Sequence, residues 1–137
     1  MKLNSGFTLI EVMVVVVILG ILAAIVVPKI MDRPDMARVT KAEQDIRALE
    51  SALSLYRLDN FRYPTTDEGL SALVSGRAGN GTRKSGGYLA RVPKDPWGNE
   101  YLYLQPGEQG EIDVYTLGAD GQPGGDGFNA DIGNWNL

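Results

Sequence analysis

Gly6-Phe7-Thr8-Leu9-Ile10-Glu11 opens the stretch that decides the fold, and an apolar run continues from it to residue 27. Between residues 12 and 27 there is no charged side chain. A helix of about 20 residues, rising about 1.5 Å per residue, spans the ~30 Å hydrocarbon core of a lipid bilayer. The run is longer than the ~7–15 apolar residues of an ordinary secretory signal. We therefore predict a membrane-spanning helix.

Glu11 is the unusual residue of this helix, because an ionised carboxylate inside a span costs about 3 kcal/mol or more. It is tolerated near the interface, when neutral, or when paired. Cleavage after Gly6 would give Phe7 a free α-ammonium group, which could pair with Glu11 within one chain or between two chains. Pairing between chains would fix their register, as buried polar groups do in coiled coils. Hydropathy alone is equally consistent with an ordinary single-pass anchor whose Glu11 lies at the headgroup level.

An amphipathic helix is predicted over residues 31–60, because apolar side chains recur at steps of three and four. The stripe comprises Val39, Ala42, Ile46, Leu49, Leu53 and Tyr56. Pro28 and Pro34 lie near the junction of the two helical segments. Each proline removes a helix hydrogen bond, so we expect a kink or local unwinding there.

A short helix around residues 68–74, with Thr66 as its N-cap, is expected next. Residues 76–87 have the composition of an exposed loop. Two strands are then predicted, over residues 100–104 and 111–117. The Pro106-Gly107 turn between them favours an antiparallel hairpin.

The amino-acid composition argues against several classes of function. The net charge is −4 and the pI about 4.8, which argues against nucleic-acid binding. The chain has no histidine and no cysteine, so it lacks the commonest general base and any disulfide. Asp95 with Glu100 or Asp113 could form an acid pair for glycoside hydrolysis, but no other feature supports one. Trp97, between Pro96 and Gly98, is expected to pack into the core.

The C-terminal segment interleaves Asp120, Asp126 and Asp131 with glycines. Calcium binds six to eight oxygens from carboxylates and carbonyls, and glycine lets the backbone present carbonyls at unusual angles. The spacing matches neither an EF-hand nor a repeat. On spacing alone, solvated Asp/Gly turns are favoured over a metal site.

The motif at residues 6–11, with the apolar run behind it, resembles the N-terminal signal of type IV pilins and pseudopilins. The resemblance implies that a prepilin peptidase cuts between Gly6 and Phe7 on the cytoplasmic side and that Phe7 is N-methylated. Glu11 then matches the glutamate that contacts a neighbour's N-terminus during assembly, and Pro28 matches the family's helix-kinking proline. The leader departs from the family in carrying a single basic residue, Lys2.

Three further stretches resemble the major pseudopilins of type II secretion: residues 63–70, residues 87–101, and the pair 118–121 with 131–135. The resemblance implies an α+β, pilin-like fold with a long N-terminal helix, a small antiparallel sheet and a calcium-binding C-terminal loop. The calcium would replace the disulfide of many type IV pilins. By resemblance, Asp120 and Asp131 are its carboxylate ligands and Leu117 a carbonyl ligand. Gln122, as a carbonyl donor, and Asp126 complete the expected set.

The expected organisation is a cleaved leader over residues 1–6, a transmembrane and filament-core helix over 7–28, and a periplasmic head over 29–137. The resemblance implies a non-enzymatic subunit of the type II secretion pseudopilus, single-pass in the inner membrane with a cytoplasmic N-terminus. It would form a homopolymer that drives export of folded proteins across the outer membrane. Its partners would be minor pseudopilins, prepilin peptidase, the inner-membrane assembly platform with its ATPase, and the outer-membrane secretin.

Two other functions stay open at this point. A type IV pilin for adhesion or motility shares the scaffold, and the absent cysteine pair and the Asp/Gly tail count against it. A membrane-anchored, calcium-dependent enzyme of the cell envelope is disfavoured by the absence of histidine and of any nucleophile motif.

Overall fold

The structure is a computed structural model that describes residues 1, 4–31, 33–75 and 87–137. The chain divides into two compact units, residues 1–35 and residues 36–137, which are described separately. Lys2 and most of the loop predicted over residues 76–87 lie outside the described residues.

Helix α1, Leu9–Met31, dominates the first unit. Its segment Leu9–Val27 is long and apolar enough to cross a membrane, with a mean hydropathy of 3.1 and no part of it buried in the chain. The backbone remains helical through Pro28. The local unwinding predicted at this proline is therefore not observed.

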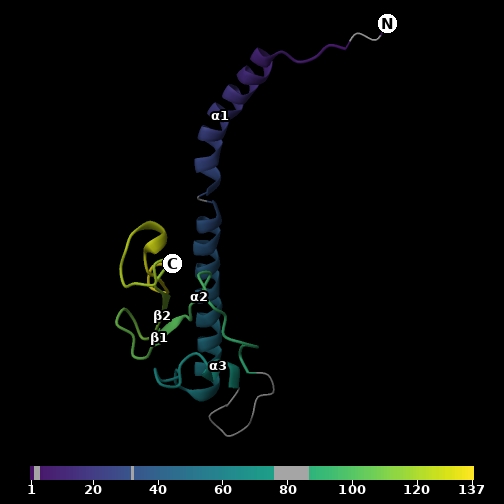
Figure 1. Cartoon of the computed structure of the whole chain (residues 1–137). Coiled ribbons are helices and arrows are strands. Elements are labelled where there is room, and N and C mark those ends of the chain that lie inside the picture. Colours follow the sequence, from purple (N-terminus) through teal and green to yellow (C-terminus); the bar gives the residue numbers. More distant parts are fainter. Residues whose placement is uncertain (2–3, 32, 76–86) are drawn as a thin grey trace. The chain divides into compact units, whose positions relative to one another are not determined.

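Helix α2, Arg33–Asn60, forms the long axis of the second unit (Figure 1). Pro34 is its second residue, in the first turn where proline is tolerated because the N–H has no helical partner. Asp32, between α1 and α2, lies outside the described residues, and with it the centre of the junction where a kink or local unwinding was predicted. The predicted apolar stripe is confirmed as the buried face: Val39 is partly buried and packs on the core, and five residues are almost fully buried, namely Ala42, Ile46, Leu49, Leu53 and Tyr56.

A three-stranded antiparallel sheet packs beside α2 in the order β1-β2-β3 (Figure 1). Strand β1, Leu102–Leu104, pairs with β2, Asp113–Thr116, so the predicted hairpin is confirmed. Strand β3, Ile132–Gly133, adds to the far edge of β2 and was not predicted. It brings the C-terminal segment back onto the sheet.

The short helix α3, Ala72–Ser75, is shorter than predicted, because residues 66–71 form turns. At the start of the turns that precede α3, the capping residue is Thr65 and not Thr66. The Thr65 N–H donates to the Glu68 carboxylate at 2.8 Å, and the Glu68 N–H donates to the Thr65 hydroxyl at 3.2 Å. This reciprocal pair is a capping box. The Thr66 hydroxyl instead donates to the carbonyl of Gln105 and accepts from its N–H.

The core of the second unit joins α2, α3 and the sheet. Besides the α2 stripe it contains Ala52, Leu70, Leu73, Tyr101, Tyr103, Ile112, Val114 and Ile132. Each large aliphatic side chain buried there contributes about 1.5–3 kcal/mol of transfer free energy. Trp97 packs against this cluster, as predicted.

Candidate functional site

The first turn of α1 is organised by Thr8 and Glu11. The Thr8 N–H and hydroxyl donate to one Glu11 oxygen at 2.8 and 2.9 Å, and the Glu11 N–H approaches the Thr8 hydroxyl at 3.4 Å. This is a capping box, in which a threonine and a glutamate three residues later satisfy each other's backbone groups. The helix is thereby fixed to begin at Leu9. The pattern Thr8-x-x-Glu11 is a capping-box signature in the sequence, so the role of Thr8, which was not predicted, could have been.

The peptide bond between Gly6 and Phe7 lies ahead of this cap, in residues 4–8, which have no regular secondary structure. Nothing would lie within 4 Å of a side chain at Gly6, and the Phe7 side chain is exposed. Phe7 and Glu11 line one shallow apolar groove with residues of the next turn. The bond is therefore sterically open, and Phe7, the residue after it, lines the same groove as Glu11.

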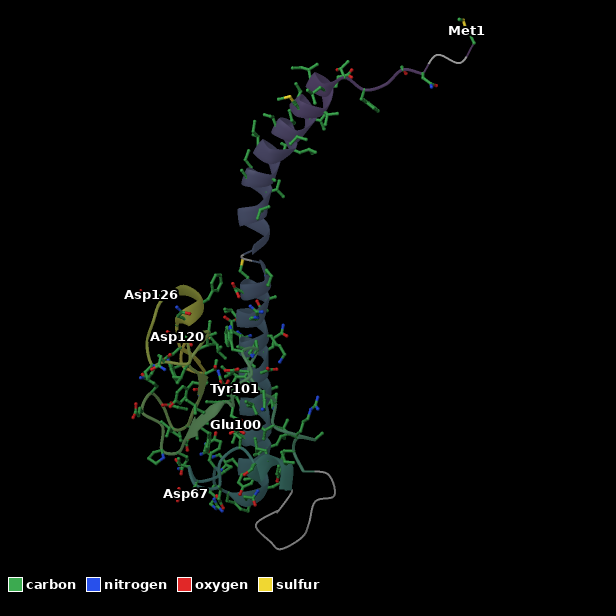
Figure 2. The ribbon with its side chains drawn as sticks, viewed as in Figure 1. Met1, Asp67, Glu100, Tyr101, Asp120 and Asp126 are labelled. Carbon is green, nitrogen blue, oxygen red and sulfur yellow. The ribbon has the colours of Figure 1, made fainter. Side chains whose placement is uncertain are left out.

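The C-terminal loop carries the predicted metal ligands, with Asp120 and Asp126 on its course (Figure 2). Asp120 accepts from the Gln122 N–H at 3.1 Å. Oδ2 of Asp131 accepts from the Gly124 N–H at 3.0 Å, whereas its Oδ1 is buried without a hydrogen-bond partner. A buried, unpartnered carboxylate oxygen fits a site for a hard cation.

The described residues do not gather three or more carboxylates at one point. Asp126 is exposed and precedes the short 3₁₀ helix η1, Gly127–Asn129, without making a side-chain cap bond. Leu117 is half-buried where β2 leads into the loop. A site in this loop would therefore combine Asp131 and Asp120 with backbone carbonyls such as that of Leu117.

The loop is closed without a disulfide, because the chain has no cysteine. The Ala119 N–H donates to the Phe128 carbonyl at 2.9 Å, across the base of the loop. Gly118 has φ +73°, and a Cβ there would lie 2.7 Å from the Ala130 carbonyl. The close approach of the two chain segments thus requires glycine at this position.

The buried carboxylates of Asp95 and Asp113 stabilise turns of the second unit by accepting hydrogen bonds from backbone N–H groups. Oδ1 of Asp95 accepts from the N–H groups of Trp97 and Asn99, and its Oδ2 accepts from the Thr116 hydroxyl. Oδ2 of Asp113 accepts from the N–H groups of residues 108 and 109. Each carboxylate accepts at least two hydrogen bonds from the protein, although Oδ1 of Asp113 is buried without a partner among the described residues. These bonds assign both side chains a structural role in place of the acid pair considered above.

A tyrosine joins the sheet side of this unit to α2. The Tyr101 hydroxyl donates to Asp45 at 2.8 Å, and Asp45 also pairs with Lys41 at 2.5 Å. Desolvation, followed by the neighbouring Asp45 carboxylate, raises the pKa of Tyr101 far above its usual value. Tyr101 therefore remains a neutral donor at every physiological pH.

Comparison with known proteins agrees with this architecture. Residues 29–135 match the family described as "Type II secretion system (T2SS), protein G", and residues 1–27 match the prokaryotic N-terminal methylation motif. The type II secretion system core protein G of Vibrio cholerae is 60% identical over 139 aligned positions, covering 100% of this chain and 95% of the relative. That of Pseudomonas aeruginosa is 60% identical, covering 96% and 95%.

A solved structure gives the same result. The crystal structure of the major pseudopilin from the type 2 secretion system of enterohaemorrhagic Escherichia coli is similar, with a TM-score of 0.65 and 46% identity. The match covers 82% of this chain and 98% of that one. These similarities favour a pseudopilin over an adhesion or motility pilin. The chain therefore belongs to the type II secretion system protein G family, the major pseudopilins, which are structural subunits of the pseudopilus and not enzymes.

Proposed function

We propose that this pseudopilin is cut between Gly6 and Phe7, is N-methylated on Phe7, and is then drawn from the inner membrane into a homopolymeric pseudopilus. The observation that carries the proposal is the position of that bond. It lies in an exposed, irregular segment directly ahead of a capped apolar helix. A peptidase needs such an extended segment, because a helical backbone cannot enter an active-site cleft.

Extraction from the bilayer is energetically feasible for α1. Moving its apolar side chains from lipid to a protein neighbour leaves them in surroundings of similar polarity, so the hydrophobic term nearly cancels. The unfavourable part falls on Glu11, the one acidic residue between Leu9 and Val27. Thr8 donates two hydrogen bonds to this carboxylate in the single subunit, before extraction from the membrane. The α-amine of a neighbour's Phe7 would supply the opposite charge in the filament.

This route sets the orientation and the partners. The N-terminus is cytoplasmic, where prepilin peptidase, the assembly platform and its ATPase act, and residues 29–137 lie in the periplasm. Minor pseudopilins and the outer-membrane secretin would meet the growing filament there. Its extension would drive folded proteins across the outer membrane.

Calcium binding in the C-terminal loop belongs to the same proposal. The unpartnered Asp131 oxygen and the acidic, glycine-rich loop support it. Asp131 and Asp120 would hold the ion together with the Leu117 carbonyl, and Gln122 and Asp126 are further candidate donors. The ion would tie the loop to the end of β2, which is the task of a disulfide in a cysteine-containing relative.

Mass spectrometry of the protein purified from a strain with an intact secretion system tests the processing step. We expect a chain that begins at Phe7 and carries one added methyl group. An intact Met1, or cleavage after Ala23 or Ala24, would contradict the proposal.

The role of Glu11 is tested separately. Glu11→Ala should insert into the membrane as the unchanged protein does but should form few filaments. Thr8→Val removes the side-chain hydroxyl that caps α1 and keeps the backbone N–H donor. Comparing it with Glu11→Ala therefore separates the effect of helix capping from that of filament assembly. Normal filaments from Glu11→Ala would refute the proposed pairing.

A further inference from the structure

Strand β3 brings the two principal candidate calcium ligands to the same end of the sheet. Thr116, the last residue of β2, pairs with Ile132, the first residue of β3. In an antiparallel ladder the next residues along, Leu117 and Asp131, therefore follow as neighbours. The Leu117 carbonyl and the Asp131 carboxylate are the groups between which the proposed ion would lie. The register of β3 thus determines whether this pair of ligands can form.

Two residues are too few to fix that register. Strand β3 consists of Ile132 and Gly133 and lies at the edge of the sheet. Strands of globular proteins are usually about three to ten residues long, so β3 makes a weak ladder. A slip by one residue would turn every side chain of the strand to its other face, the Asp131 carboxylate with them. Contacts beyond the strand must therefore hold it in place.

Asn134 supplies the first of these contacts. Its backbone N–H donates to the Val114 carbonyl at 3.1 Å, and its side-chain oxygen accepts from the Val114 N–H at 3.2 Å. Its side-chain amide also donates to the Ile112 carbonyl at 3.0 Å. These three bonds attach the end of β3 to β2, but none of them involves Asp131.

Asn136 supplies the contact that reaches Asp131. Its Nδ2 donates to the Asp131 carbonyl at 3.1 Å, while its Oδ1 accepts from the Gly133 N–H at 2.9 Å. Its own N–H donates to the Gly133 carbonyl at 3.1 Å. The tail is folded back closely here, because a Cβ on Gly133 would overlap the ring of Trp135. One side-chain amide therefore spans the whole of β3 and binds the residue ahead of it.

The side chain of Asp131 depends on this support. Its Oδ2 accepts one hydrogen bond, from the Gly124 N–H at 3.0 Å, and its Oδ1 is buried with no partner among the described residues. The position of Oδ1 in the loop is consequently set by the backbone of Asp131. That backbone is what the amide of Asn136 holds.

We infer that Asn136 is a positioning residue for calcium, which fixes where the unpartnered oxygen of Asp131 lies in the C-terminal loop. The inference rests on the proposed calcium site and assigns to the tail after β3 a role in ion affinity. Asn136 itself would not bind the ion. Residues that orient metal ligands typically change the metal affinity about 10- to 100-fold when they are replaced.

The first test measures calcium binding by isothermal titration calorimetry, on the full chain in detergent micelles after removal of metal with chelator. Asn136→Ala should raise the dissociation constant for calcium about tenfold. Thr66→Ala is the matched control. It also removes two hydrogen bonds between a side chain and the backbone, to Gln105 beyond the end of β1, at the opposite edge of the sheet. It should lower the thermal midpoint without calcium and leave the dissociation constant unchanged.

The second test counts the water molecules on bound europium(III), from its luminescence lifetimes in H2O and in D2O. If Asp131 moves away from the ion, a water takes its place, so Asn136→Ala should show about one more bound water than the unchanged protein. A loss of stability alone would not change this number.

Asn136→Asp provides a second variant. It can still accept from the Gly133 N–H but cannot donate to the Asp131 carbonyl. Its added negative charge by itself would favour calcium, so an additional bound water in this variant would report the position of Asp131 and not the charge.

Equal dissociation constants and equal hydration in Asn136→Ala and the unchanged protein would overturn the inference. So would an equal loss of calcium affinity in Thr66→Ala, because reduced stability would then explain both. Failure of the unchanged protein to bind calcium would instead overturn the proposed site itself. The two failures are therefore distinguishable.

Discussion

The hydroxyl of Thr116 donates a 2.5 Å hydrogen bond to Oδ2 of Asp95, and both side chains are buried. This bond ties strand β2 to the turn at residues 95–99, where the other Asp95 oxygen already accepts two backbone N–H groups. The turn and the sheet are thus held together by one carboxylate. That carboxylate is satisfied only while Thr116 is in place.

Removing the Thr116 hydroxyl should therefore destabilise the head. Thr116→Val keeps the volume and leaves a buried carboxylate oxygen unpartnered, so we expect the free energy of unfolding to fall by about 1–3 kcal/mol. Thr116→Ser keeps the hydroxyl and should lose less. Urea unfolding of the full chain in detergent micelles, followed by the fluorescence of Trp97 and Trp135, measures both. Equal stability of the valine and serine variants would contradict the assigned bond.

The decrease in the free energy of unfolding at acid pH should depend on Glu68. A bidentate pair with Arg62, at 2.7 and 2.9 Å, and the Thr65 N–H lower the pKa of Glu68 from 4.5 to about 2. A lowered native pKa stabilises the fold above pH 4.5, and this contribution is lost as the pH falls from about 4.5 to about 2. The Glu68 and Arg62 side chains are 39% and 51% exposed, so solvent screening reduces the effect to about 1 kcal/mol or less.

Glu68→Gln should accordingly lower the free energy of unfolding at pH 7 by that small amount and flatten its decline below pH 4.5. Asp67→Asn, an adjacent and exposed change of the same charge, is the matched control. If the free energy of unfolding fell with pH in the same way in Glu68→Gln and in the unchanged protein, the Glu68–Arg62 pair would not contribute to stability.

The sequence predicts the parts of this fold that are periodic or strongly apolar. The α2 stripe is confirmed because five buried residues recur with the helical period over four turns, and the hairpin because two β-rich runs flank Pro106-Gly107. Strand β3 contains only Ile132 and Gly133, too few residues for any period. Its existence depends on β2 being present to pair with it.

The capping residues show a second limit. Thr65 and Thr66 are adjacent, but only Thr65 is followed three residues later by a glutamate, Glu68, so the capping-box pattern of the sequence favours Thr65. The role of Thr66 could not be predicted, because its hydroxyl engages the backbone of Gln105, 39 residues away. At the other end of the chain the cap is local, and the pattern Thr8-x-x-Glu11 is sufficient to predict it. The proposed metal ligands came from the resemblance alone, since spacing favoured plain turns.

Gly118 should be hard to replace in the C-terminal loop. A Cβ there would lie within 3 Å of backbone atoms of Asn129 and Ala130, in addition to the strain of φ +73°. Gly118→Ala should lower the free energy of unfolding by about 3 kcal/mol or more. Gly69 has a similar φ, +60°, but its nearest neighbour would be 3.8 Å away. Gly69→Ala should therefore lose only about 1 kcal/mol. Equal losses in the two variants would mean that the loop yields to the methyl group.

Calcium should stabilise the head through the C-terminal loop. A ligand that binds only the native state adds about 2.7 kcal/mol at one hundred times its dissociation constant. The thermal midpoint in detergent micelles should therefore rise with added calcium and fall with chelator. Magnesium should substitute poorly, because it requires a tighter octahedral set of oxygens.

Asp131 should carry most of this response, because its Oδ1 is buried and has no partner in the protein. Asp131→Asn is expected to abolish most of the calcium-dependent rise, whereas Asp126→Asn, at an exposed position, should reduce it less. Asp67→Asn controls for the loss of one negative charge outside the loop and should leave the rise unchanged. If the thermal midpoint of unfolding were the same with calcium and with chelator, calcium would not bind this loop. The burial of Asp131 Oδ1 would then have to be offset by the hydrogen bonds that close the loop, beginning with that of Ala119 to Phe128.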